Sequence, residues 1–228
     1  MLIDMHCHFD MMPNPEGYIL QREQMGDFVI GMTNRPSHFR MGLPHINALK
    51  HIRLALGMHP LLVASNIKEL PMFGTLIDKT SYIGEIGLDF SREGRVTKSQ
   101  QIDALHKILF GLRGKKKIVS VHSRRAEKEL LNLLREYEIQ NVIFHWYSGA
   151  VGLISDIIEQ GYYFSINEAM TLSKNGQAII EKIPKERILT ESDAPYNEKT
   201  DIRKALLRLG ITEDEVYANF TRLMSEMR

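Results

Sequence analysis

The fold is decided by residues 118–145, IVSVHSRRAEKELLNLLREYEIQNVIFH, where one helical segment separates two short apolar runs. The runs Ile118–His122 and Val142–His145 are rich in β-branched residues and each ends in a histidine, as buried strands with a polar end do. Between them lies Arg125–Tyr137, whose leucines share one helical face: Leu130, Leu133 and Leu134. The order strand, helix, strand predicts a βαβ unit with parallel strands.

The same pattern recurs along the whole chain. Eight apolar runs recur, six of which end in a polar residue. They are Leu2–His6, Phe28–Thr33, Leu54–His59, Tyr82–Gly87, Ile118–His122, Val142–His145, Tyr162–Ile166 and Ile188–Glu191. Further helices are predicted at Ser99–Leu112, at Ala150–Gln160 with Gly161 as its stop, and after an N-cap at Thr212. Only a short helix fits between the second and third runs. Eight such units predict an α/β fold, a (β/α)8 barrel of the TIM type, as a single domain over residues 1–228; an open doubly wound sheet is the alternative.

The composition is that of an ordinary globular protein. Hydrophobic residues make up 43% and charged residues 25% of the 228 residues, a length that suits one compact barrel. The formal net charge of +1 excludes a protein that holds nucleic acid through bulk positive charge. Cys7 is the one cysteine, so an intrachain disulfide is excluded and a reducing compartment is expected. With neither a secretory signal nor an apolar membrane span, we expect a cytoplasmic protein without membrane contact.

Chemically active side chains stand at the ends of five of the eight runs. The first run leads into Asp4-Met-His6-Cys-His8, where residues two apart point to one face and both imidazoles reach one ion. The other four ends carry Glu85, His122, His145 and the pair Glu191 and Asp193. In a barrel these ends meet on the face where active sites lie. A buried salt bridge would explain Glu85 alone, but the convergence of five ends predicts a metal-dependent active site.

The remaining histidines divide into two groups. His59 ends the third run in Gly57-Met-His59-Pro60, and we expect it at the same site. Four others fall in loops or helices and are expected to be ordinary surface residues: His38, His45, His51 and His106.

Seven motifs follow one another through nearly the whole chain. They are Asp4-x-His6-Cys-His8-x-Asp10, Gly57-x-His59-Pro60, Ile83-Gly-Glu85-Ile-Gly-Leu-Asp89, Val121-His122-Ser-Arg124-x-Ala126, His145-x-x-Ser-Gly149, Glu191-x-Asp193-Ala-Pro195 and Asn219-Phe220. In this order they resemble the TatD family of metal-dependent deoxyribonucleases, within the amidohydrolase-like barrels. The chain is a short variant, with losses around Arg35–Arg53 and after Tyr196, where the loop shrinks to Asn197–Thr200.

The resemblance implies two divalent metal ions and a nuclease activity. His6, His8 and Asp193 would hold one ion, His122 and His145 the other, and Glu85 would bridge them. His59 and Arg124 would lie near the scissile phosphate. The implied substrate is DNA, single-stranded or with a frayed 3′ end, cut as by a 3′ exonuclease. Short relatives that resemble parts of bacterial anti-phage cassettes also suggest a defence role with protein partners.

The mixed histidine and carboxylate ligands suit zinc, manganese or magnesium. We hypothesise that a hydroxide held by the ions attacks phosphorus while Asp193 accepts the proton. Glu191 either acts on the proton or the leaving group, or fixes a neighbouring side chain. Arg124 would neutralise a phosphate oxygen. Trp146 follows the sixth-run histidine and either stacks on a terminal base or packs beneath a loop.

Two other functions remain open on these residues. The metal motifs also suit an amidohydrolase or a phosphatase that acts on a small molecule. Alternatively, the chain is a metal-binding subunit of a larger complex, although a complete ligand set argues against an inactive scaffold.

Overall fold

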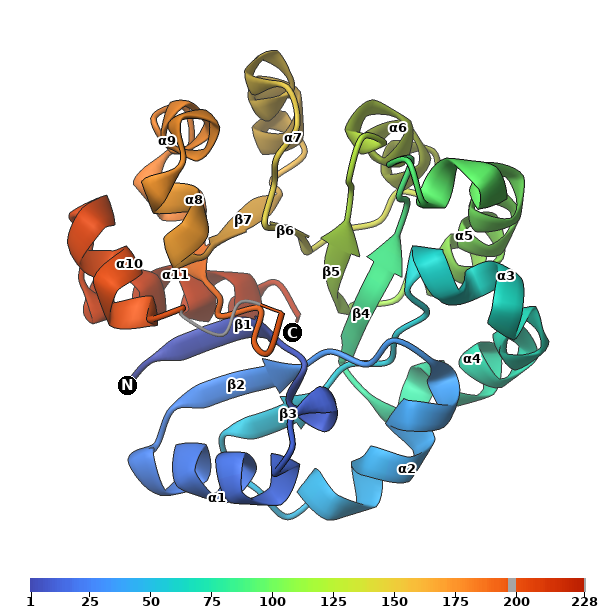
Figure 1. The fold of residues 1–228 in the computed structure, drawn as a ribbon, viewed down its shortest axis with the longest axis horizontal. Coiled ribbons are helices and arrows are strands. Elements are labelled where there is room, and N and C mark those ends of the chain that lie inside the picture. The colour runs from blue at the N-terminus through green and yellow to red at the C-terminus, as the bar shows by residue number, and fades with distance from the viewer. Residues whose placement is uncertain (197–199, 228) are drawn as a thin grey trace.

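The computed structural model describes residues 1–196 and 200–227, and it has the predicted α/β barrel architecture. Seen end-on, the strands lie at the centre and the helices surround them (Figure 1). The eight strands of the described residues are β1 (Ile3–Cys7), β2 (Phe28–Gly31), β3 (Ile52–Leu54), β4 (Tyr82–Gly87), β5 (Ile118–His122), β6 (Val142–His145), β7 (Tyr163–Ile166) and β8 (Ile188–Thr190). Paired strands are parallel, so their carboxyl ends open on one face. The predicted fold class is confirmed.

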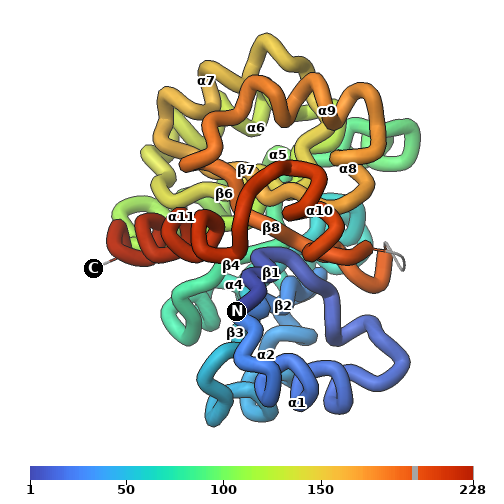
Figure 2. The backbone as a smooth tube through the Cα atoms, turned by 90° about the vertical axis from the view of Figure 1, so that its left-hand side faces the viewer, coloured from blue at the N-terminus to red at the C-terminus, as the bar shows by residue number. Residues whose placement is uncertain are grey.

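Hydrogen bonding divides the strands into two sheets that adjoin at both edges. One has the order β1-β2-β3 and the other β4-β5-β6-β7-β8. Between β3 and β4, Leu56 forms an isolated bridge with Ile83. Between β8 and β1, the amide of His8 donates to the carbonyl of Ala194 at 2.7 Å. Figure 2 shows β1 beside both β2 and β8. A few backbone hydrogen bonds at each of the two seams therefore connect the sheets into a ring.

The helices connect the strands and cover the outside of the barrel. They are α1 (Pro15–Met25), α2 (Pro36–Ile46), α3 (Val63–Asn66), α4 (Leu70–Leu76), α5 (Lys98–Leu112), α6 (Glu127–Glu136), α7 (Ile154–Glu159), α8 (Glu168–Leu172), α9 (Lys174–Ile180), α10 (Ile202–Leu209) and α11 (Glu213–Ser225). In α6 the apolar stripe is buried, and each leucine contributes roughly 1.5–3 kcal/mol. α11 begins with a capping box between Thr212 and Glu215, which confirms the predicted N-cap. No helix of the described residues is long and apolar enough to cross a bilayer.

The third strand lies earlier than its predicted bounds. We expected Leu54–His59, whereas β3 is Ile52–Leu54, so this prediction was wrong. The chain leaves the ladder because Gly57 approaches β2 closely: a Cβ atom there would lie 1.6 Å from the carbonyl oxygen of Thr33, and only glycine permits this. The amide of Gly57 donates instead to Oγ1 of Thr33 at 3.1 Å. The resulting turn carries His59 to the carboxyl face.

The strand pairing is irregular at two places where chemically active side chains emerge. The register shifts between Asp4 and Cys7 on β1, and again between Ile83 and Ile86 on β4. His6 and Glu85 lie inside these two intervals. A local irregularity of this kind re-aims a side chain relative to the regular pleat. The strand pairing is therefore irregular at the two positions where His6 and Glu85 point into the mouth of the barrel.

Candidate metal centre

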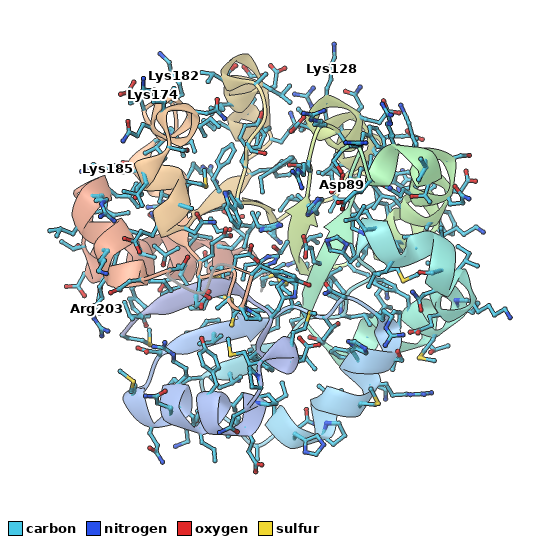
Figure 3. All side chains as sticks on the ribbon, viewed as in Figure 1. Asp89, Lys128, Lys174, Lys182, Lys185 and Arg203 are labelled. Atoms are coloured by element: carbon cyan, nitrogen blue, oxygen red, sulfur yellow. The ribbon has the colours of Figure 1, made fainter. Side chains whose placement is uncertain are left out.

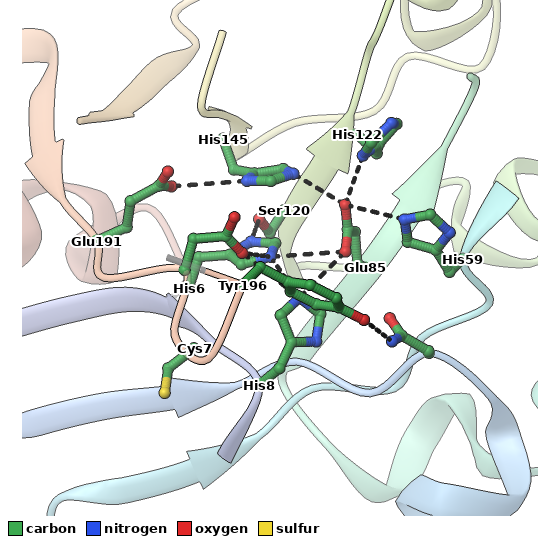
Figure 4. A network of polar contacts seen from close by, with 12 residues as sticks. His6, Cys7, His8, His59, Glu85, Ser120, His122, His145, Glu191 and Tyr196 are labelled. Atoms are coloured by element: carbon green, nitrogen blue, oxygen red, sulfur yellow. Dashed lines mark hydrogen bonds and ion pairs between the residues drawn. The ribbon is translucent and has the colours of Figure 1, made fainter. Parts of the chain in front are cut away.

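The first group of possible metal ligands contains two imidazoles and two carboxylates. Nε2 of His6 lies 3.1 Å from Nε2 of His8. Oε2 of Glu85 lies 3.6 Å from the first of these nitrogens and 3.3 Å from the second. Oδ1 of Asp193 lies 3.7 Å from both. All four side chains are buried, and Figure 4 shows the two rings turned towards Glu85. Donor atoms that face one another this closely are arranged as ligands of one cation.

The electrostatics of this group fit a divalent ion. Burial lowers the pKa of His6 well below its ordinary value, and the neighbouring His145 adds to the effect. Burial raises the pKa of Asp193 to about 7, and the nearby carboxylates of Glu191 and Glu85 push it in the same direction. Neutral imidazoles offer lone pairs, and a cation offsets the repulsion between buried carboxylates. The residues present therefore suit a metal such as zinc or manganese.

Glu85 connects the first group to a second. Its other oxygen, Oε1, lies 2.7 Å from Nδ1 of His122 and 2.8 Å from Nε2 of His145. Burial opposes ionisation, but the imidazoles of His59 and His145 hold the pKa of Glu85 well below its ordinary value. The carboxylate thus presents one oxygen to each group (Figure 4). This is the arrangement of a ligand that bridges two cations.

His59 approaches the same carboxylate in a different way. Its Nε2 lies 3.5 Å from Oε1 of Glu85, while its Nδ1 accepts a hydrogen bond from the amide of Leu61 at 3.2 Å. Burial lowers the pKa of His59, so the ring is held neutral. A neutral imidazole whose Nδ1 accepts carries its proton on Nε2. In this tautomer His59 faces the centre as a hydrogen-bond donor, while its ring nitrogen, Glu85 and His122 also lie close enough together to share a cation.

A further carboxylate, that of Asp89, lies behind His122. Oδ2 of Asp89 lies 2.9 Å from Nε2 of His122, on the side of the ring away from Glu85. The Asp89 side chain is buried and also accepts the amide of Ser91. Asp89 stands within one of the seven sequence motifs, but we predicted no role for it. The signal was its position four residues after Glu85, directly beyond β4.

Glu191 lies behind the other histidine of the second group. Its Oε2 is 3.8 Å from Nδ1 of His145, and Figure 4 shows it on the far side of that ring from Glu85. It also accepts hydrogen bonds from the hydroxyl of Ser165 and from Nδ2 of Asn167, the latter at 2.9 Å. Of the two roles considered for Glu191, these contacts favour fixing a neighbour.

The two groups open into a cavity of about 620 Å³. Its walls include His59, Arg124 and Trp146, together with Tyr196, which the sequence analysis did not single out. The Tyr196 ring packs edge-on against His8 with centroids 5.0 Å apart. Of the loop expected to be shortened at 197–200, only Thr200 falls within the described residues. Tyr196, in the segment that follows β8, thus forms part of the cavity wall.

Left-handed backbone conformations mark the carboxyl ends of three strands. Arg125 (φ 56°), Trp146 (φ 36°) and Asp193 (φ 52°) follow β5, β6 and β8. Non-glycine residues rarely adopt positive φ, and the strain of doing so is concentrated at functional sites. At these three positions the backbone turns sharply at the cavity.

The structure brings together the side chains that the sequence analysis grouped. His6, His8, Glu85, His122, His145 and Asp193 face one another, with Glu191 behind them and His59, Arg124 and Trp146 in the cavity wall. The four histidines that we expected outside the site do not belong to the groups of possible metal ligands. His38 contacts Asp10, His51 contacts Glu23, the ring of His106 is hydrogen-bonded to Tyr137, and His45 is exposed.

Residues 3–220 match the sequence model of the family described as TatD related DNase. The chain belongs to this family. As a member of this family, the chain is an enzyme that hydrolyses ester bonds. The resemblance noted from the motifs is thereby confirmed.

Relatives and solved structures agree with the family assignment. The chain is 26% identical over 200 residues to an uncharacterized metal-dependent hydrolase of Methanocaldococcus jannaschii, covering 85% of this chain and 78% of that one. It is 30% identical over 129 residues to the deoxyribonuclease TATDN3 of Homo sapiens, a match that spans 55% of this chain and 47% of that protein. The crystal structure of YJJV, a TatD homolog from Escherichia coli, has the same fold, with a TM-score of 0.83 at 23% identity, covering 99% of this chain and 97% of that chain.

Proposed function

We propose that this chain is a phosphodiesterase that uses two divalent ions to hydrolyse DNA, removing nucleotides from the 3′ end of a single strand. The single observation that carries the proposal is the position of Glu85. Its two oxygens face two separate histidine groups at the floor of one cavity. A dinuclear site with a bridging carboxylate suits phosphodiester hydrolysis, because the charge on phosphate must be neutralised as attack proceeds.

We assign the candidate ligands to two ions. His6, His8 and Asp193, whose donor atoms form one compact group, would hold the first ion. His122 and His145, which both face Oε1 of Glu85, would hold the second, with Glu85 shared between the ions. Bound divalent ions in such a site lower the pKa of water and neutralise phosphate oxygens.

Several side chains of the chain itself support the reaction. Asp193, beside His6 and His8, is positioned to take the proton that leaves the attacking water. Nε2 of His59 would donate a hydrogen bond to a phosphate oxygen. Arg124 lies in the cavity wall, where its guanidinium would pair with a non-bridging oxygen. Glu191 would keep the His145 ring in its productive orientation.

The cavity supports a strand terminus as substrate. It holds about 620 Å³, which is room for a nucleotide-sized group but not for a duplex, and Trp146 in its wall offers a face on which a terminal base can stack. A single-stranded or frayed end fits these dimensions.

The test is cleavage of single-stranded DNA labelled at either end, by metal-stripped protein supplied with Mg, Mn or Zn. Glu85→Ala is the inactive variant, and His51→Ala, outside both groups, is the matched control. We expect laddering from the 3′ end that needs a metal, Glu85 and Asp193 but not His51. Turnover of small phosphate monoesters alone would instead assign the chain as a phosphatase, and full activity of Glu85→Ala with metal would overturn the bridging role.

A further inference from the structure

Two neighbouring loops on the carboxyl face carry an unusual density of positive charge. The segment between β4 and α5 supplies Arg92, Arg95 and Lys98, and the segment after β5 supplies Arg124, Arg125 and Lys128. We call these six residues the basic rim. All six side chains are exposed.

The basic rim is continuous with the mouth of the cavity. The amide of Phe90 donates to the carbonyl of Arg124 at 2.9 Å, which ties the two loops together. Asp89 and Glu93 from the first loop, and Ser123 and Arg124 from the second, line the cavity itself. A ligand that emerges from the cavity on this side therefore passes directly over the rim.

The side chains of the basic rim form no ion pairs among the described residues, although the ammonium of Lys98 lies 4.3 Å from the centroid of the Phe90 ring. Among residues 1–196 and 200–227, no carboxylate forms an ion pair with any of its six side chains. Some cations elsewhere on the surface are paired, for example Lys115 with Asp78 at 2.8 Å and Arg113 with Glu138 at 3.1 Å. The rim differs in gathering six cations without an ion pair on two adjoining segments. The nearby carboxylate of Glu127 accepts the backbone amide of Arg125, not its guanidinium.

The local charge also differs in sign from the rest of the chain. Residues 91–98 and 123–129 carry six cations against three carboxylates, whereas the whole chain has a net charge of +1. The remainder of the molecule is therefore slightly negative. A polyanion that meets this surface is attracted to one side of the cavity and not to the others.

We propose that the basic rim binds the phosphate backbone of the DNA strand beyond the scissile bond, so that the strand leaves the cavity between α5 and α6. This inference rests on the proposed function, because it takes DNA as the substrate. Arg124, in the cavity wall, contacts the scissile phosphate as proposed above, and the rest of the rim, led by Arg92 and Arg95, contacts the phosphates beyond it. The contacts are to backbone and carry no sequence preference.

Because these contacts are ionic, they have a measurable signature. Each neutralised phosphate of a single strand adds about −0.7 to the slope of log affinity against log salt concentration. Loss of two contacts therefore lowers the slope by about 1.4 and weakens binding of a long oligonucleotide by about tenfold at moderate salt. A dinucleotide ends before the rim and is unaffected.

The variant for the test is Arg92→Gln with Arg95→Gln, neither of which lines the cavity. Its matched control is Lys182→Gln with Lys185→Gln, an equal change of charge. Figure 3 shows these two lysines beside α9 and α10, on the other side of the molecule from Lys128 and α6, and they precede β8 at the amino ends of the strands. Each pair is measured in the active chain and in the Glu85→Ala background.

Two readouts separate this inference from the proposed function. Binding of labelled single-stranded DNA to the Glu85→Ala forms is followed by fluorescence anisotropy over a range of salt. Cleavage of a dinucleotide and of a long oligonucleotide is followed with the active forms. We expect the arginine variant alone to lose affinity and salt slope, and to raise KM for the oligonucleotide while kcat/KM for the dinucleotide is unchanged.

Other outcomes are equally informative. If the parent cleaves both substrates but the arginine variant binds and cuts the oligonucleotide as the lysine control does, the basic rim proposal fails and the proposed function stands. If DNA binding depends on the arginines but no form cuts DNA, the rim stands and the nuclease function fails. An equal loss of DNA affinity in both variants would show that only the net charge matters, and the basic rim proposal would be wrong.

Discussion

Asp89 and His122 form a buried pair in which Oδ2 of the carboxylate lies 2.9 Å from Nε2 of the imidazole. The pKa of Asp89 is lowered to about 2: burial opposes ionisation, but hydrogen bonds with His122 and Ser91 outweigh it. An ionised carboxylate can only accept, so Nε2 carries a proton and donates it to Asp89. Nδ1 lies 2.7 Å from the ionised carboxylate of Glu85 and donates to it, so the ring carries both protons. Burial lowers the pKa of His122, but the hydrogen bonds with Asp89 and Glu85 outweigh it and raise that pKa. A bound cation would take the place of the Nδ1 proton.

Replacing Asp89 by Asn should weaken metal binding in the second group by about 10- to 100-fold. Oδ1 of asparagine can keep the bond to the Ser91 amide, but its NH2 group then faces Nε2 and moves the ring proton to Nδ1. Competition with a chromogenic chelator measures the affinity, and Asp103→Asn on the exposed face of α5 is the control. Equal metal affinities in the two variants would show that Asp89 does not fix the protonation and orientation of the His122 ring.

Glu191→Gln should lower both activity and stability. The carboxylate accepts from Ser165 and Asn167 on separate oxygens, and glutamine offers one acceptor in place of two. One buried donor is left without a partner, at a cost of about 1–3 kcal/mol in the free energy of unfolding. Urea unfolding measures the change in stability. The decrease in kcat measures the effect on activity of losing the contact that orients His145. A catalytic proton-transfer role would instead abolish kcat at unchanged stability.

Metal binding should stabilise the fold measurably. At a metal concentration about 100 times Kd, binding to the folded chain alone adds about 2.7 kcal/mol, which for a chain of this length raises Tm by roughly 5–10 °C. The reason is that the donor groups are buried and preassembled only in the folded chain. Thermal unfolding with and without chelator measures the shift. His6→Ala with His8→Ala should lose most of it, and an unchanged shift would place the ion elsewhere.

Trp146 should matter for DNA and not for small esters. The side chain is half-buried in the cavity wall, and its backbone is left-handed. If it stacks on the terminal base, Trp146→Ala raises KM for DNA by about 5- to 150-fold, equivalent to about 1–3 kcal/mol. Trp146→Phe keeps an aromatic face and should recover much of the affinity. If both variants instead destabilise the fold and leave KM unchanged, the ring packs beneath the loop.

The barrel and the meeting of the candidate ligands could be predicted because both follow from repetition. A run such as Ile118–His122 ends in one polar residue, and parallel strands bring all such ends to one face. The reach of His6 and His8 to one point follows from alternation along a strand. That these residues hold two ions stays a prediction.

Other features depend on contacts that no periodic pattern encodes. The difference between the predicted and observed bounds of β3 follows from the packing of Gly57 against the carbonyl of Thr33, a residue that follows β2. The pairing of Asp89 with His122 depends on how two adjacent strand ends are staggered. Tyr196 reaches His8 only because the β8 loop folds back over β1. Each is a long-range relationship between residues whose local sequence is unremarkable.

The seam between β1 and β8 also fixes when the enzyme can begin to work. His6 and His8 are made first and Asp193 near the end, yet they share one group, and the amide of Asp193 bonds the carbonyl of His6 at 2.9 Å. A chain still emerging from the ribosome without its eighth strand has the histidines but not the carboxylate that faces them. On the proposed ligand assignment, the first metal group is therefore complete only once β8 has docked against β1.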